Sequence, residues 1–205
     1  MSVYGKQIHE DVELINEGFL VGLSKEGKEL KKELQEELKS YDEKYSFKKA
    51  LTTNFNKNIQ AKVEKLIRSK FNKVFISTIV ETETTVNGAT SYSYTQQVVA
   101  LYKNNLYTIK ILYSTSYARI NSFKELDLEK CTIPVDVLEN VLSWNKRNYL
   151  MKVTKNKISL ENLSYNSFDY STFDNIVRYC ATKHPEIDCK INKLTKSISF
   201  KKSSK

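Results

Sequence analysis

The chain is poor in the residues that interrupt regular structure and in those that cross-link it. Its 205 residues include only 5 glycines, 2 prolines and 3 cysteines. So few glycines and prolines mark no linker at which two domains would separate. Three cysteines form no complete set of disulfides, and neither a signal-peptide core nor the roughly 20 consecutive apolar residues of a membrane span is present. We therefore expect a soluble cytoplasmic protein that does not bind membranes.

Catalytic signatures are also missing. The sequence has no HExxH, GxSxG, P-loop or GxGxxG motif, and its only histidines are His9 and His184. His9 stands beside Glu10 on an amphipathic segment, where a surface position is expected. Carboxylates are concentrated in the first 46 residues, which hold 11 of the 24, and there they are interleaved with lysines, as on a solvated helix. These absences predict a protein that is not an enzyme and that needs no cofactor or metal.

Two small groups of residues leave a chemical alternative open. Cys180 and His184 are four residues apart, so a helix that included both would place them on one face as a thiolate–imidazole pair or half of a metal site. The spacing to Cys189 matches no standard zinc pattern, and cysteines buried in the core are the favoured interpretation. Glu81 and Glu83 lie on one predicted strand and could serve acid–base chemistry, although an exposed strand end explains them better.

Arginine is scarce, because only four of the 33 basic residues are arginines. Arginine makes the bidentate contacts that read guanine, whereas lysine acts as a mobile point charge, so sequence-specific base recognition is disfavoured. The net charge of +9 is unevenly distributed: residues 1–46 carry −4, residues 47–73 carry +7, residues 74–130 are neutral and residues 131–205 carry +6. A basic excess favours partners with phosphate or carboxylate surfaces. An AT-rich coding genome is an alternative source of the many lysines.

A duplication in the last third of the chain is the strongest architectural signal. Leu138–Trp144 recurs as Phe173–Tyr179, and six of the seven aligned pairs are identical or conservative. A second matched stretch follows each copy, Met151–Lys155 against Cys189–Lys193, and then Ile158-Ser159-Leu160 against Ile198-Ser199-Phe200. Each copy therefore predicts a helix followed by a hairpin with lysines at its turn.

Helical periodicity dominates the first 73 residues. An amphipathic helix is expected over residues 8–19, and another over residues 24–45. The second has a narrow apolar seam between charged residues, which predicts a helix packed on the body or, alternatively, a coiled-coil or dimerisation arm. A third helix is expected from about residue 50 to 69. The predicted inward residues are Leu30, Leu34, Leu38, Tyr41 and Tyr45 in the second helix and Leu51, Phe55, Ile59, Val63, Leu66 and Ile67 in the third.

From residue 74 the hydrophobic period changes to two. Asn87-Gly88 is a strong two-residue hairpin signal, and a second turn is expected at Asn104-Asn105. Taken literally, these turns pair residues whose numbers sum to 175 and to 209, which predicts a three-stranded meander over about residues 74–115. One face of this meander would collect Phe75, Ile79, Tyr94, Val98, Ala100, Tyr102, Tyr107, Ile109, Ile111 and Tyr113.

The repeated helices complete the predicted fold. Pro134 is expected early in the first, with Val135, Leu138, Val141 and Leu142 inward; Ser171 and Asp174 resemble a capping box for the second, with Phe173, Ile176, Val177 and Cys180 inward. These patterns predict an α+β fold: an N-terminal helical layer packed on an antiparallel sheet, with a duplicated helix-plus-hairpin unit in the C-terminal third. Residues 1–73 would form the helices, as an arm or a packed layer. Residues 74–205 would form the body, with repeated units near 134–160 and 170–200.

Exposed cations provide the candidate site. The third helix would carry Lys57, Lys65 and Arg68 opposite its apolar stripe, and the hairpins would carry Lys103, Lys155, Lys157, Lys193 and Lys196 at their turns. If the three hairpins lie side by side, their lysines converge on one rim that grips phosphates without reading bases. An ordinary solvated surface is the alternative for both groups. Six tyrosines of the meander could stack unpaired bases, but core positions are expected for most of them.

The leading functional expectation is therefore a non-enzymatic basic binding protein that acts on nucleic acid or a nucleoprotein complex. A small accessory, regulatory or inhibitory protein of a phage or another mobile element would suit the size and the missing motifs. The second class is a protein–protein interaction module that uses the acidic N-terminal helices, including self-association through helix 24–45. The third is a small metal-dependent nuclease that uses His184, Cys180 or scattered carboxylates.

Overall fold

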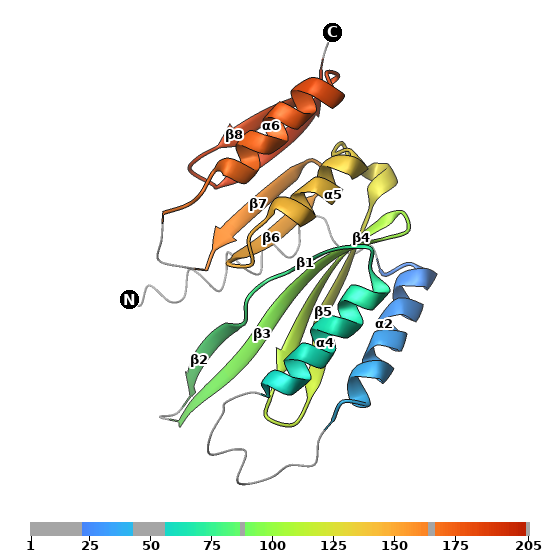
Figure 1. Ribbon diagram of the computed structural model, residues 1–205, viewed down its shortest axis with the longest axis vertical. Coiled ribbons are helices and arrows are strands. Elements are labelled where there is room, and N and C mark those ends of the chain that lie inside the picture. Colours follow the sequence, from blue (N-terminus) through green and yellow to red (C-terminus); the bar gives the residue numbers. More distant parts are fainter. Residues whose placement is uncertain (1–21, 43–55, 87–88, 164–166, 204–205) are drawn as a thin grey trace.

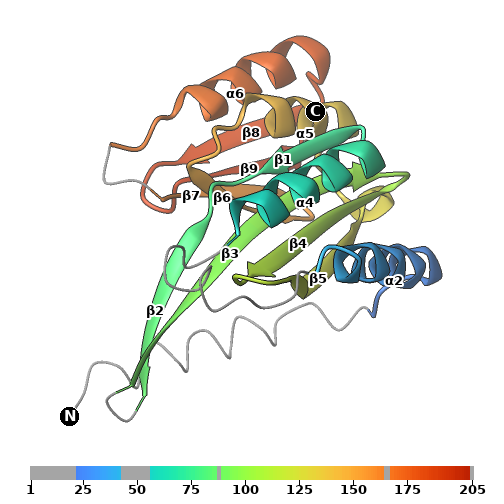
Figure 2. The same cartoon turned by 60° about the horizontal axis from the view of Figure 1, so that its bottom comes forward.

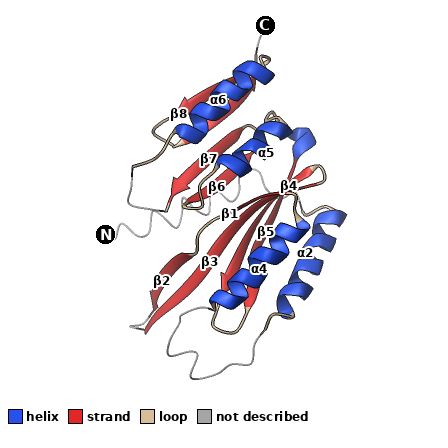
Figure 3. Ribbon diagram, viewed as in Figure 1, coloured by secondary structure: helices blue, strands red, loops and turns tan. Residues whose placement is uncertain are grey.

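Two antiparallel sheets and the helices packed on them make up the molecule. The computed structural model describes residues 22–42, 56–86, 89–163 and 167–203 (Figures 1 and 3). Sheet A has the strand order β1-β3-β4-β5, with β2 also paired to β3, and sheet B has the order β6-β7-β9-β8. The predicted α+β fold, with its helix-plus-hairpin repeat, is confirmed. No helix within the described segments is long and apolar enough to cross a membrane.

The elements follow one another along the chain. The N-terminal helices are α2 (Lys25–Lys39) and α4 (Lys57–Lys70). Sheet A comprises β1 (Lys73–Ile76), β2 (Val80–Val86), β3 (Ala89–Tyr102), β4 (Asn105–Tyr113) and β5 (Ala118–Asp127), and a short 3₁₀ helix, η1 (Leu128–Lys130), follows it. The repeat comprises α5 (Val135–Trp144), β6 (Tyr149–Thr154), β7 (Lys157–Asn162), α6 (Ser171–Lys183), β8 (Ile187–Asn192) and β9 (Ser197–Lys202). The helix expected at residues 8–19, and Tyr45, Leu51 and Phe55, lie outside the described segments.

Helices α2 and α4 cover one face of sheet A (Figure 2). The narrow apolar seam of α2 is used inside the molecule, since Leu30, Leu34 and Leu38 are at most 4% exposed. The inward residues predicted for α4 that can be compared, Ile59, Val63, Leu66 and Ile67, are buried in the same core. α2 is therefore part of a packed layer, and self-association through its apolar seam would require α2 to leave sheet A.

Polar contacts hold α2 at both ends. The backbone N–H and the hydroxyl of Ser24, the residue before the helix, donate to the Glu125 carboxylate at 2.8 and 2.6 Å. Beyond the other end, the Arg119 guanidinium donates two hydrogen bonds of 2.7 Å to Asp42. These contacts are partly exposed, so each contributes little free energy, but together they set the position of the helix along sheet A.

The register of sheet A corrects the predicted meander in two places. The β3–β4 turn is Lys103-Asn104 rather than Asn104-Asn105, so paired residue numbers sum to 207, and this two-residue shift leaves every side chain on its predicted face. β2 keeps the predicted sum of 175, but β1 pairs with a sum of 174, because residues 77–79 add one residue opposite β3. Phe75 consequently faces the other side of the sheet, where it joins a second core.

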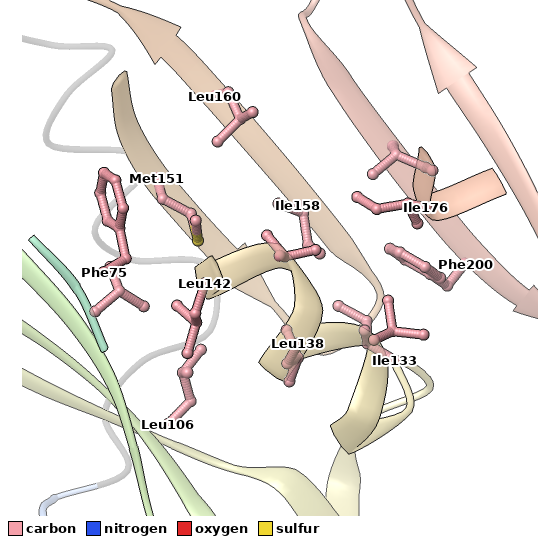
Figure 4. Close-up of a cluster of buried hydrophobic side chains, with 14 of the residues drawn as sticks. Phe75, Leu106, Ile133, Leu138, Leu142, Met151, Ile158, Leu160, Ile176 and Phe200 are labelled. Atoms are coloured by element: carbon pink, nitrogen blue, oxygen red, sulfur yellow. The ribbon is translucent and has the colours of Figure 1, made fainter. Parts of the chain in front are cut away.

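The second core lies on the opposite face of sheet A and extends through α5 and α6 to sheet B. Figure 4 shows Phe75 and Leu106 from sheet A directed toward Leu142 of α5 and Met151 of β6. Farther from sheet A, Ile158 of β7 and Phe200 of β9 continue the same cluster. The part of sheet A around β1 and β3 is therefore buried on both faces, and the repeat unit shares a continuous core with it. Neither face of β3 near Val98 and Val99 is exposed, at 1% and 0%.

A polar network accompanies this core where β6 approaches β3. The side-chain amide of Gln97 donates to the Met151 carbonyl at 2.8 Å and accepts from the Met151 N–H at 2.7 Å, as a paired strand would. Nearby, Glu64 of α4 accepts hydrogen bonds from Gln96 and Arg147. Burial would raise the pKa of Glu64, but these donors and Gln60 outweigh it and lower that pKa. The extra residues 77–79 bring the chain to this network, since Thr78 N–H donates to the Arg147 carbonyl.

Two details of the repeated helices differ from the expectation. Val135 is 46% exposed rather than inward, because α5 begins at this residue, and Val137 is buried instead. The capping box at Ser171 is wrong as well: α6 begins at Ser171, and the Asp169 side chain accepts its N–H at 2.9 Å. A hydrogen bond from Lys146, together with those from Ser171, lowers the pKa of Asp169 to about 2.

The two copies of the repeat are related by an approximate twofold axis through sheet B. β7 and β9 are antiparallel neighbours, and the equivalent residues Ile158 and Ile198 are paired with each other. Lys157 pairs with Ser199, and the pair formed by their equivalents, Ser197 and Ser159, is also present. This register is what a twofold axis between β7 and β9 requires. The axis places α5 and α6 side by side on the face of sheet B that is directed toward the core. The rings of Trp144 and its equivalent Tyr179 are in edge-to-face contact, with 6.0 Å between their centres.

Candidate nucleic-acid interface

The outer face of sheet B, directed away from α5 and α6, carries a cluster of lysines. Residues alternate between the two faces along each strand: Met151, Ile158, Cys189 and Ile198 lie in the core, so their neighbours point outward. By this alternation the outward positions at the centre of this face are Lys152, Thr154, Lys157, Ser159, Lys190, Asn192, Ser197 and Ser199, of which Ser197 is covered, at 1% exposed. We call these eight residues the lysine face.

Strand pairing fixes how the lysine face is arranged. One row across the sheet runs Lys152, Ser159, Ser197 and Asn192, and the next runs Thr154, Lys157, Ser199 and Lys190. Diagonal neighbours on adjacent strands lie about 7–8 Å apart, so Lys152 and Lys157 are close enough to bind adjacent anionic groups. Of the hydroxyls between the lysines, that of Ser199 donates to the Lys190 carbonyl at 3.3 Å and that of Thr154 to the Lys157 carbonyl at 3.4 Å, which leaves Ser159 as a donor for an external group. The face therefore combines positive charge with a hydroxyl donor on a rigid backbone.

The lysines of this face are free to meet an external anion. Lys152 and Lys190 are exposed, Lys157 is half-buried, and none of the three forms an ion pair within the described segments. Glu161 and Asp188, also exposed, are the acidic residues that point outward from these strands; Glu161 is a diagonal neighbour of Lys152, and Asp188 lies two residues from Lys190 on β8. Lysine side chains are charged at neutral pH, so the centre of the face is positive.

The predicted α4 cations form a separate group. Lys57, Lys65 and Arg68 are exposed, as expected for the face opposite the buried stripe, and they make no ion pair within the part of the chain that is described. α4 covers the face of sheet A opposite to α5 and sheet B (Figure 2). The α4 cations and the lysine face therefore lie on different sides of sheet A. Whether α4 contacts nucleic acid stays a prediction.

The expected single rim of hairpin lysines is wrong. The Phe200 N–H donates to the Asn156 carbonyl in the first tip of sheet B, whereas the Leu160 N–H donates to the Lys196 carbonyl in the second tip. Because β7 and β9 are antiparallel, these contacts place the two tips at opposite ends of the sheet. The Lys103 turn belongs to sheet A. Because adjacent copies are related by a twofold axis perpendicular to the sheet, their tips point in opposite directions along it.

The tip lysines also have local partners. Lys103 forms an ion pair with Glu26 at 2.7 Å, and this hydrogen bond raises the pKa of Lys103. Lys193 lies over the Tyr170 ring and Lys196 over the Phe168 ring, at 6.0 and 5.6 Å from the ring centres. Lys155 is exposed in the other tip, where its carbonyl accepts the Thr132 N–H. Of the predicted hairpin lysines, only Lys157 belongs to the lysine face.

Sequence reasoning missed Lys152 and Lys190 as site residues. Both lie within strands, whereas the candidate lysines were expected at hairpin turns. The repeat alignment itself contains the signal, because it matches Lys152 with Lys190 at positions where a period of two places polar residues outward. An equivalent outward lysine in both copies marks this face more specifically than lysines in turns, which are common in most proteins.

Cys180 and His184, the residues considered for catalysis or metal binding, lie where α6 ends and where it meets the start of α5. α6 ends at Lys183, and His184 caps it, with its backbone N–H donating to the Cys180 carbonyl at 2.8 Å. His184 Nε2 lies 2.8 Å from an Asp136 carboxylate oxygen, and the Tyr179 hydroxyl donates to the same carboxylate at 2.9 Å. The hydrogen bond to Asp136 raises the pKa of His184. This group joins the start of α5 to the end of α6.

The cysteines lie in or beside the core of the repeat unit. Cys180 is buried, and its interaction with Cys189, followed by burial, raises the pKa of its thiol. Across the described segments, no group of histidine, cysteine and carboxylate side chains could hold a metal ion. Glu81 lies opposite Tyr94, as predicted, and accepts its hydroxyl at 3.2 Å on an exposed part of β2. Among the tyrosines considered for base stacking, Tyr92 is exposed, at 52%, whereas Tyr94, Tyr107 and Tyr113 are buried.

Comparison with known proteins identifies no similar family, protein or structure. No protein-family model, curated protein or solved structure matches the chain. The site must therefore be interpreted from its own residues.

Proposed function

We propose that this protein binds nucleic acid, either free or within a nucleoprotein complex, and that it acts without catalysis. The lysine face of sheet B supplies the contact surface. The observation that carries the proposal is the central position of Lys152, Lys157 and Lys190, which have no carboxylate partner within the described segments. An uncompensated group of cations on a rigid surface favours a polyanion, since each neutralised phosphate releases a counterion.

The composition of the face favours phosphate contacts over base recognition. Its cations are lysines, and it presents no aromatic side chain on which a base could stack. Ser159 lies between the lysines, where its hydroxyl can donate to a phosphate oxygen, whereas the Ser199 hydroxyl donates to the Lys190 carbonyl at 3.3 Å. We therefore expect binding that depends strongly on salt and weakly on sequence.

The test compares triple variants with the same change in charge. Fluorescence anisotropy would measure the affinity of the wild-type protein for DNA and RNA between about 50 and 200 mM salt, the range in which phosphate contacts are lost. The first variant replaces Lys152, Lys157 and Lys190 by alanine. The matched control replaces Lys25, Lys28 and Lys32, three exposed lysines on helix α2, whose five lysines are balanced by five glutamates. A third variant, with alanine at Lys57, Lys65 and Arg68, tests the α4 group.

The lysine-face variant should lower the slope of log K against log salt by about 2–3, because each phosphate contact contributes about 0.7–0.9. The α2 control should leave this slope nearly unchanged. If wild-type protein shows no salt-dependent binding at low salt, the proposal is wrong. If only the α4 variant loses binding, nucleic-acid binding stands but the lysine face is not its site.

A further inference from the structure

We infer that the lysine face recognises double-stranded nucleic acid by contacting the phosphates of both strands in equivalent ways. This inference rests on the proposed function and goes beyond it by naming the form of the ligand. Its basis is the approximate twofold axis of sheet B, which passes through the lysine face between β7 and β9. A nucleic-acid duplex has twofold axes of its own, perpendicular to its helical axis, whereas a single strand has a direction and no such axis.

The side chains on the face follow the symmetry of the backbone. Lys152 pairs with Ser159, and their equivalents Lys190 and Ser199 are paired on the other side of the axis. Each half therefore presents a lysine on the outer strand and a serine on the inner strand. Elsewhere on the face the symmetry is lost, because Ser197 occupies the position equivalent to Lys157 and Glu161 the position equivalent to Lys201. The matched charges are therefore those of Lys152 and Lys190 on the two outer strands.

The spacing of the two lysines suits a duplex. Lys152 and Lys190 are separated by three strand spacings across the sheet and by two residues along it. With about 4.8 Å between strands and about 3.3 Å per residue, their Cα atoms lie roughly 16 Å apart. The major groove of B-form DNA is about 12 Å wide, and flexible lysine side chains accommodate the difference between duplex geometries. Each lysine can thus reach the phosphates of a different strand across one groove.

Symmetry makes a prediction that a general basic surface does not make. If the axis of the protein coincides with that of the duplex, Lys152 and Lys190 contribute equally. On a single strand, which runs in one direction across the face, the two lysines meet different groups and contribute unequally. Equal contributions on a duplex are therefore the signature of the proposed binding mode.

The experiment uses the full chain with a labelled duplex of about 20 base pairs, in DNA and RNA forms, and each of its separated strands at about 0.1 M salt. The single variants are Lys152→Ala and Lys190→Ala, with Lys28→Ala on α2 as the control. Each face variant should lower the duplex association constant by about 8-fold, the effect of one lost phosphate contact at this salt concentration. Thermal unfolding of each variant checks that the exposed substitutions leave the fold intact.

Three results would overturn parts of this scheme in distinguishable ways. Binding of a separated strand as tightly as the duplex removes the inference and leaves the proposed function in place. Losses for Lys152→Ala and Lys190→Ala that differ by more than about threefold, half of the log-scale effect expected for one contact, have the same consequence. If the wild-type protein binds neither form of nucleic acid, the proposed function fails, and the inference fails with it.

Discussion

The contact between His184 and Asp136 predicts how the stability of the fold depends on pH. Asp136 is the second residue of α5, and His184 follows the last residue of α6. Both carboxylate oxygens lie within 2.9 Å of His184 Nε2, while Nδ1 lies 3.4 Å from Glu186. We consider the replacement Asp136→Asn, because asparagine keeps the shape of the side chain and removes its charge.

The sign follows from the two pKa shifts. Hydrogen bonding to Asp136 raises the pKa of His184, so its contribution is fully present below about pH 6.5, the pKa of an unfolded histidine, and is lost as pH rises through the folded value. Burial would raise the pKa of Asp136, but hydrogen bonds from His184 and Tyr179 lower it. Its contribution is present above about pH 3.9 and is lost as pH falls through the lower folded value. The pair therefore stabilises the fold most strongly near pH 5–6.

The magnitude is moderate because the pair is partly exposed. A hydrogen bond to a charged group contributes about 1.5–3 kcal/mol when buried. The side chains of His184 and Asp136 are 20% and 42% exposed, so solvent screening reduces this to about 1–1.5 kcal/mol. For a chain of this size, such a loss corresponds to a decrease in Tm of roughly 2–6 °C. The decrease should appear at pH 6 and nearly vanish at pH 9.

Circular dichroism with thermal and urea unfolding at both pH values measures this difference. Asp174→Asn is the matched control, since Asp174 is an exposed carboxylate in the first turn of α6 and forms no ion pair within the described segments. It should change the pH dependence little. Equal destabilisation of Asp136→Asn at pH 6 and pH 9 would refute the argument, because the neutral hydrogen bonds of the side chain would then account for the whole effect.

Two further predictions concern the contact between β3 and β6 and the pairing of β7 with β9. Gln97→Ala leaves the Met151 N–H and carbonyl without their partners, so we expect a loss of about 2–4 kcal/mol in the free energy of unfolding by urea. A loss below about 0.5 kcal/mol, too small for an unsatisfied buried group, would show that water replaces the amide. Ile158→Ala and Ile198→Ala each empty a fully buried site beside the twofold axis and should cost similar amounts, about 2–5 kcal/mol, in the same assay. A large inequality would show that the two copies pack differently.

Local patterns predicted the elements that have a strong period and a clear turn. The seam of Leu30, Leu34 and Leu38 predicted both α2 and its buried side, because helical period and burial coincide there. The duplication predicted two helix-plus-hairpin units, and both are present. β5 was not predicted as a strand, because its polar edge-strand sequence has no clear alternation and its register shifts between Lys110 and Ile111 of the neighbouring β4. This segment becomes a strand by pairing with β4, and a local sequence pattern does not reveal that pairing.

Local sequence patterns predicted only part of the candidate site. Lys57, Lys65 and Arg68 lie on the exposed face of α4 as predicted, since the helical wheel alone separates them from the buried stripe. Lys157 was assigned to a hairpin rim but belongs to a sheet face. The reason is that turns are local features, whereas the direction in which a hairpin points is set by its neighbours in the sheet.

Composition and periodicity are enough to establish an α+β chain with basic segments, few arginines and a repeated helix-plus-hairpin unit. These properties follow from interactions between residues close in sequence, which a linear pattern records. The tertiary structure alone joined the two copies through Ile158 and Ile198, turned their tips to opposite ends and placed Lys190 on the same face of the sheet as Lys152 and Lys157. The pairing of β7 with β9 joins residues about 40 positions apart, and its register depends on burying the apolar side of both copies against one core.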